Sequence, residues 1–184
     1  MSTLIIHPED STTTFLTPIY SGIKEKTVIN GGVTKNELIR EIEAHDRIMM
    51  MGHGSPSGLL AMGRFKNHYG LYIIDEDMAH LLSDKKDSVF IWCYADRFVQ
   101  KHRLNGFYSG MFISEVAEAQ YLNLPADETM IVESNNKFSN IVCENIHENS
   151  EILLEKVKTE YGKIINYNPI AKYNHERLNR AIFN

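Results

Sequence analysis

Residues 48–54 read Ile-Met-Met-Met-Gly-His-Gly, and residues 89–93 read Val-Phe-Ile-Trp-Cys. Each segment is an apolar run of four that leads into a chemically reactive side chain, His53 in the first and Cys93 in the second. An apolar run of this length is typical of a strand that is buried on both faces of a parallel sheet. Reacting groups collect at the carboxyl ends of such strands. The sequence therefore predicts that His53 and Cys93 meet at one edge of a sheet.

The chain around these two segments alternates between strand and helix patterns as far as residue 122. Strands are expected at residues 3–6, 27–29, 48–51, 89–92 and 106–113, and a small antiparallel hairpin at 59–62 and 69–73. Helices are expected at residues 11–20, 34–44, 75–83, 97–102 and 114–122. This alternation predicts an α/β fold with a mainly parallel central sheet that is flanked by helices.

Beyond Pro125 the apolar residues recur at helical spacing. Helices are expected at residues 136–147, 150–162 and 175–182. There is no internal repeat and no linker-like segment. The chain is therefore expected to form one domain over residues 1–184, with a core at 3–122 and a helical C-terminal third at 126–184.

Composition excludes several classes of function. The chain has 184 residues and a formal net charge of −5, and it lacks the basic face of a general nucleic-acid binder. No apolar run reaches the roughly 18 residues of a membrane span, and the N-terminus does not resemble a signal peptide. The two cysteines, Cys93 and Cys143, show no metal-ligand or disulfide spacing, which indicates a reduced, cytoplasmic setting. No metal and no cofactor are expected, since residues 30–32 lack the spacing of a phosphate loop.

A cysteine beside a histidine is suited to nucleophilic catalysis. A free thiol has a pKa near ~8.5, and a neighbouring imidazole can take its proton and later protonate a leaving amine. Gly54 has no side chain, so its backbone N–H can approach a substrate carbonyl and act as an oxyanion donor together with the N–H of Cys93. Cys143 lies among apolar residues and is expected to pack in the core.

These segments resemble the caspase-like cysteine peptidases, the clan of caspases, gingipains, clostripain and legumain. An apolar run before His-Gly is followed 40 residues later by an apolar run before Cys93. The resemblance extends over residues 3–122, about two-thirds of the chain. It implies a caspase-like three-layer sandwich and hydrolysis of a peptide or protein substrate, with Cys93 as nucleophile and His53 as general acid/base.

In the same family, the strand after the cysteine helps to form the specificity pocket. The resemblance therefore implies that Ser109, Ser114 and Glu115 contact a substrate side chain, although Ser114 and Glu115 also suit a helix N-terminus. The segment between Cys93 and the next expected strand is short, which predicts that any activity belongs to the intact single chain.

Two alternatives remain open. Bulky Trp92 precedes the cysteine where many family members have a small residue, so the chain could be a catalytically silent domain of the same fold that acts as a binding or regulatory module. A flavodoxin-like domain is a third reading, and it would need an acidic cluster or a phosphate loop at the strand ends. The sequence shows neither feature, and it leaves the oligomeric state and the peptide preference undetermined.

Overall fold

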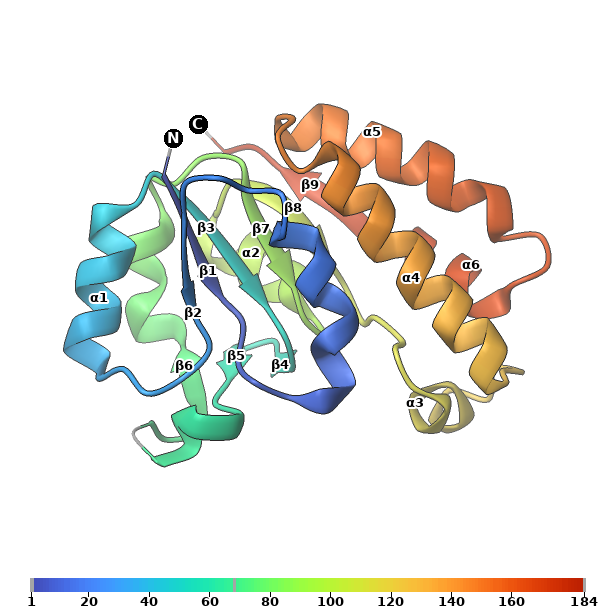
Figure 1. The fold of residues 1–184 in the computed structure, drawn as a ribbon, viewed down its shortest axis with the longest axis horizontal. Helices are drawn as coiled ribbons and strands as arrows, with labels where there is room; N and C mark the ends of the chain where they lie inside the picture. The colour runs from blue at the N-terminus through green and yellow to red at the C-terminus, as the bar shows by residue number, and fades with distance from the viewer. Residues whose placement is uncertain (1, 68, 184) are drawn as a thin grey trace.

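The computed structural model describes residues 2–67 and 69–183 and shows an α/β fold around a six-stranded mixed sheet (Figure 1). The strand order is β2-β1-β3-β7-β8-β9, and every neighbouring pair is parallel except β8 and β9. The strands are β1 (Thr3–Ile6), β2 (Lys26–Ile29), β3 (Arg47–Met51), β7 (Ser88–Ile91), β8 (Gly106–Ser109) and β9 (Leu178–Ala181). The mainly parallel sheet expected from the sequence is confirmed.

The two segments that carry His53 and Cys93 are neighbouring parallel strands. Met49 of β3 pairs with Val89 of β7, and two residues further on Met51 pairs with Ile91. Both strands therefore end at the same edge of the sheet. The sequence prediction that His53 and Cys93 leave a common edge is correct.

Side chains alternate between the two faces of the sheet, and both faces are buried. Ile48 and Met50 belong to one apolar cluster, whereas Met49 and Met51 belong to a second, and all four are fully buried. This is why the strand is apolar at every position instead of at every second one. Burying a side chain of this size stabilises the fold by roughly 1.5–3 kcal/mol.

Helices cover both faces of the sheet and supply the other half of each cluster (Figure 1). One face is covered by α1 (Lys35–Ala44), η3 (Glu76–Leu82) and α2 (Ala95–His102), and the other by η1 (Ser11–Tyr20), α4 (Glu128–Asn145) and α5 (Ser150–Tyr161). The beginning of α1 follows directly from the sequence. The Thr34 hydroxyl accepts from the Glu37 N–H, and the Glu37 carboxylate accepts from the Thr34 N–H.

A second, three-stranded antiparallel sheet follows β3. It consists of β4 (Gly54–Ser55), β5 (Gly58–Leu60) and β6 (Tyr72–Ile74), with η2 (Gly63–Asn67) between the last two. The antiparallel pairing expected for this region is confirmed, with shifted bounds. The His53 carbonyl accepts from the Leu60 N–H (2.9 Å), so the sheet holds the histidine backbone in place.

The C-terminal third is not helical throughout, and the expected helix at 175–182 is wrong. Helix α6 (Pro169–Glu176) ends earlier, and β9 then pairs antiparallel with all four residues of β8. The start of α6 had a readable signal, since the Asn168 side chain caps the helix and Pro169 occupies its first turn. Strand β9 is four residues long, too short for a sequence period to distinguish it from a helix end.

Other boundaries also differ from expectation. Strand β8 ends at Ser109, four residues earlier than predicted, and a loop leads to α3 (Val116–Tyr121). Helix α4 begins at Glu128, eight residues earlier than predicted, and η4 (Gly162–Ile164) follows α5.

In the part of the chain that the structure describes, no helix is long and apolar enough to cross a membrane.

Candidate active site

His53 lies at the junction between the two sheets. Gly52 precedes it with a φ of 140°, in a region that favours glycine, and the Gly52 N–H donates to the Ile91 carbonyl (3.0 Å). This bond joins the end of β3 to the end of β7. The histidine therefore leaves the sheet beside the strand that leads to the cysteine.

Cys93 lies in the sharp connection between β7 and α2. Tyr94, which follows it, adopts a left-handed conformation (φ 68°), and the Trp92 carbonyl accepts from the Ala95 N–H (3.1 Å) as the helix begins. The Trp92 indole N–H donates to the Ser55 carbonyl (3.1 Å), so the residue before the cysteine is anchored to the small sheet. The bulky tryptophan is thus almost fully buried, and it forms part of the wall of the pocket that His53 and Cys93 line.

One small pocket is lined by both reactive residues. Its volume is about 20 Å³, and its walls include His53, Cys93, Phe15, Phe112 and Glu118. A space of this size holds about one water molecule. The structure therefore brings His53 and Cys93 to a common site, and the space between the walls of this site is small.

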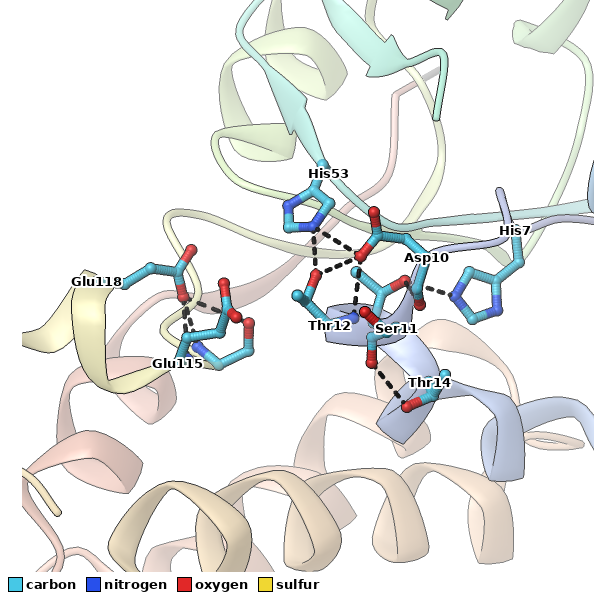
Figure 2. A network of polar contacts seen from close by, with 10 residues as sticks. His7, Asp10, Ser11, Thr12, Thr14, His53, Glu115 and Glu118 are labelled. Atoms are coloured by element: carbon cyan, nitrogen blue, oxygen red, sulfur yellow. Dashed lines mark hydrogen bonds and ion pairs between the residues drawn. The ribbon is translucent and has the colours of Figure 1, made fainter. Parts of the chain in front are cut away.

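The His53 ring is held by a chain of polar contacts from the segment that follows β1, the strand beside β3 (Figure 2). The Thr12 hydroxyl lies 2.7 Å from His53 Nε2 and 2.6 Å from Asp10 Oδ1, and Asp10 Oδ1 lies 3.6 Å from Nε2. The pKa of Asp10 is held below its usual value, mainly by the hydrogen bond from the Thr12 side chain and further by His53. Asp10 is therefore an ionised acceptor at neutral pH.

This contact chain determines which ring nitrogen carries the proton. The Thr12 hydroxyl has one proton and donates it to the Asp10 carboxylate, so it can only accept from His53. Nε2 is consequently protonated. Nδ1, which makes no hydrogen bond within the described residues, lies on the side of the ring turned away from Asp10 (Figure 2). A neutral His53 therefore presents Nδ1 as a base.

The Cys93 thiol is protonated at neutral pH. Burial, with a smaller contribution from the nearby Glu118 carboxylate, raises its pKa to about 11. The thiol donates a weak hydrogen bond to the Phe112 carbonyl (3.6 Å). Among the hydrogen bonds of the described residues, none joins Cys93 to His53. The sulfur is thus present at the site as a protonated thiol of a half-buried residue.

Gly54 and Ser109 lie next to the two reactive segments, but neither residue lines the small pocket. The hydrogen bond between His53 and Leu60 makes Gly54 and Leu59 a non-hydrogen-bonded pair, so the Gly54 N–H points away from β5. Ser109 is fully buried, and its hydroxyl donates to the Trp92 carbonyl (3.2 Å). Ser109 therefore braces the strand that carries Cys93 and lies beneath the surface of the pocket.

Ser114 and Glu115 lie where α3 begins. The Glu118 carboxylate accepts from the backbone N–H groups of Ser114 (2.7 Å) and Glu115 (3.2 Å), which Figure 2 shows beside the Thr12 network. Ser114 also lines the pocket of Cys93. Both residues line a second, larger groove of about 550 Å³ between η1 and α4.

Several residues of the site were not singled out from the sequence. Among them are Asp10, Thr12, Phe112 and Glu118. A signal existed for the first two, because Asp10 begins the run Asp-Ser-Thr-Thr just after β1, a strand adjacent to β3. Phe112 and Glu118 reach the pocket from a loop and a helix whose positions depend on the tertiary fold.

Cys143 lies outside this pocket. Its neighbours Ile141 and Val142 are buried in the core, while Cys143 itself is half-buried on α4 with its sulfur 3.8 Å from the Ser21 hydroxyl. It is a second free thiol that any labelling experiment must account for. Across residues 2–67 and 69–183, no group of three or more His, Cys, Asp or Glu side chains could hold a metal ion.

No family model matches the chain, and no curated protein sequence matches it either.

Proposed function

We propose that this chain is a cysteine peptidase of the caspase-like type, in which Cys93 attacks a peptide carbonyl and His53 acts as general acid/base. One observation carries the proposal. The Thr12 hydroxyl gives its single proton to Asp10 and so leaves Nδ1 as the unprotonated nitrogen of His53, a residue that lines the same pocket as Cys93. A nucleophile, a base and a group that orients the base are the three parts of such a centre.

The proposed reaction uses each contact of the site. Once Cys93 leaves the Phe112 carbonyl, Nδ1 takes the thiol proton, and the resulting imidazolium is stabilised through Thr12 by the Asp10 carboxylate. The thiolate adds to the carbonyl carbon, and the oxyanion accepts from the backbone N–H groups of Gly54 and Cys93. The imidazolium then protonates the leaving amine. Water, deprotonated by Nδ1, hydrolyses the thioester, and the proton returns to the sulfur.

The resting state requires an opening step. A thiol with a pKa of about 11 is protonated at neutral pH, and a pocket of about 20 Å³ has no room for a peptide. We propose that substrate binding or movement of the loop that carries Phe112 releases the sulfur, in the intact single chain. A reducing compartment such as the cytoplasm would keep both cysteines free.

The protected thiol also supports a second candidate function. A thiol that is protonated at neutral pH and bonded to a backbone carbonyl is what a catalytically silent domain would retain. Such a domain would bind a peptide or protein partner without cleaving it. The two candidates make opposite predictions about covalent chemistry at Cys93.

A peptide-like electrophile that reacts with thiols separates the two candidates. The peptidase predicts covalent labelling at Cys93 of the full-length chain, located by mass spectrometry, and strong loss of labelling in His53→Ala. Cys143→Ala should label like the original protein. Labelling confined to Cys143, or equal labelling with and without His53, would favour the silent domain.

A further inference from the structure

A buried arginine begins the strand that leads to His53. Arg47 is the first residue of β3, so it lies at the end of the sheet opposite to the candidate active site. In Figure 1 this is the end that carries the label N, whereas β4, which follows His53, lies at the other end. Arg47 is only 2% exposed. An arginine is rarely buried to this degree without a partner of opposite charge, so its environment indicates what it binds.

Two of the three guanidinium nitrogens have structural partners. Nε of Arg47 donates to the Asp87 carbonyl (2.7 Å), and Nη1 donates to the Ile146 carbonyl (2.7 Å). Ile146 is the C-cap of α4, where a positive charge is favourable. Nη2 is buried and has no hydrogen bond among the described residues. One donor group of the guanidinium is thus left over after the structural bonds are made.

The charge of Arg47 is not neutralised by an ion pair. None of the ion pairs among the described residues includes Arg47. The Asp87 carboxylate instead accepts from the backbone N–H (2.8 Å) and the hydroxyl (3.0 Å) of Ser150. Burial lowers the pKa of Arg47 to about 10, so the guanidinium is still charged at neutral pH. A buried charge without a counterion is costly, and an anion from outside would reduce this cost.

Arg47 lies in the lining of a pocket of about 360 Å³. The pocket is located between the loop that joins η1 to β2 and the turn that follows α4. Lys24 and His147 line it and are exposed, and buried Ile23 adds an apolar wall. Glu25 lines it as well, so with a neutral histidine the lining carries one net positive charge. A pocket of this volume can accommodate a small molecule.

We infer that this pocket binds the carboxylate group of a small, singly charged organic acid, with Arg47 as the buried cation and Lys24 at the entrance. The one unused donor nitrogen suits one carboxylate oxygen in a charge-assisted hydrogen bond. The single net positive charge favours a singly charged ligand, and Ile23 can contact a short apolar chain. Because Nη2 is buried, binding requires a small displacement of the exposed Lys24 and His147 side chains. The inference is independent of the proposed function, since this pocket and the pocket of Cys93 share no lining residue.

NMR titration of the full-length chain measures this binding directly. The probes are butyrate, its neutral analogue butyramide and inorganic phosphate, each at pH 8 and constant ionic strength. Butyrate should shift the Nε–H signal of Arg47 in a saturable manner and bind at least about tenfold more tightly than butyramide, because only butyrate forms charge-assisted hydrogen bonds. Equal binding of butyrate and butyramide, or an unchanged Arg47 signal, would overturn the inference. Tighter binding of phosphate than of butyrate would reject the singly charged ligand.

A substitution of the exposed Lys24 tests the site without disturbing the core. Arg47 bonds two backbone carbonyls, so a change at Arg47 itself would test folding together with binding. Lys24→Gln should weaken butyrate binding by about two- to fivefold, as expected for a partly screened charge. The matched control is Lys35→Gln, which makes the same change in net charge at an exposed position outside the pocket and should keep the affinity. Unchanged affinity in Lys24→Gln, or an equal loss in both variants, contradicts the assignment.

Discussion

At the scale of single residues, the site depends on where one hydroxyl proton goes. Thr12 donates to Asp10 and accepts from His53, so the imidazole is held in the form that leaves Nδ1 unprotonated. A carboxylate alone at 3.6 Å would attract a charged ring without fixing its orientation as firmly. The threonine is therefore a positioning residue for the proposed base.

Replacing this hydroxyl should weaken the site without removing any reactive group. In Thr12→Val we expect the pKa of Asp10 to rise toward its usual value, because its largest stabilising contact is lost. Labelling of Cys93 by a peptide-like electrophile should slow by about ten- to a hundredfold. Proton-detected ¹⁵N spectra should show the Nε2–H form of His53 in the original protein and a mixture of tautomers in the variant.

Two controls accompany the Thr12 substitution. Thr12→Ser keeps a hydroxyl and should restore both the spectrum and the labelling rate. Thr14→Val removes a neighbouring exposed hydroxyl that bonds only to the Ser11 carbonyl, and it should change neither. Unchanged His53 spectra in Thr12→Val would show that the threonine does not set the tautomer.

At the scale of elements, the site is assembled where short segments pack very closely. A Cβ atom added at Gly54 of β4 would lie 1.9 Å from Cδ1 of Trp92, which is almost fully buried. Only a glycine allows the small sheet to lie flat against the indole that follows β7. The glycine beside the histidine thus has a packing role in addition to its proposed role as an oxyanion donor.

Gly54→Ala should consequently destabilise the protein by at least about 2 kcal/mol, since neither β4 nor the indole can move freely. Urea unfolding followed by the fluorescence of Trp92, the one tryptophan in the chain, measures the change. Gly22→Ala is the matched control, because an added Cβ there meets no atom within 4 Å. Equal stability of the two variants would contradict the packing argument.

The loop that covers the thiol is held by one buried side chain of α6. Asn174 donates to the Ile113 carbonyl (2.8 Å) and accepts from the Ile113 N–H (2.7 Å), next to the Phe112 carbonyl that accepts from Cys93. Asn174→Ala leaves two buried backbone groups unpaired, so we expect a loss of about 2–4 kcal/mol in unfolding free energy. Small alkylating reagents should then modify Cys93 faster under native conditions.

A second destabilised variant separates local opening from general unfolding. Leu153→Ala removes buried apolar volume on α5 and should cost about 2–5 kcal/mol. It leaves the contacts of Asn174 in place and should not accelerate the modification of Cys93 below the unfolding transition. Equal acceleration in both variants would mean that the loop has no specific role in covering the thiol.

At the scale of the whole molecule, a buried histidine links stability to pH. His7 is 6% exposed, it lies near the hydroxyls of Tyr20 (3.1 Å) and Thr13 (3.2 Å), and burial lowers its pKa to about 4. The folded state therefore favours the neutral ring. In the unfolded chain the ring has a pKa near 6.5, so it takes up a proton at a higher pH than it does in the folded protein.

The sign of the effect follows from proton binding. Between pH 6.5 and 4 the unfolded state binds the proton and the folded state does not, so the stability present above pH 6.5 is lost as the pH falls. The difference in pKa corresponds to about 3 kcal/mol. Urea unfolding at pH 7.5, 5.5 and 4.5 should show this loss in the original protein and a smaller one in His7→Gln. If the unfolding free energy fell equally with pH in both proteins, His7 would not be the group that links stability to pH.

The sequence alone determined the sheet and the place where the reactive residues meet. Apolar runs at residues 48–51 and 89–92 carry strong local information, because strands buried on both faces need apolar residues at every position. The capping box at Thr34 is equally local, since Thr34 and Glu37 bond each other within one helical turn. His53 and Cys93 follow such runs directly, so their common edge could be predicted.

The tertiary structure alone decided the state of these groups. The proton on His53 is placed by Thr12, the Cys93 thiol is covered by Phe112, and Nη2 of Arg47 is left without a hydrogen bond among the described residues, all through contacts between segments far apart in the chain. The last strand, β9, likewise exists because β8 offers it an open edge. Hydrogen bonding and burial depend on which groups the fold brings together, and no local pattern of residues records that information.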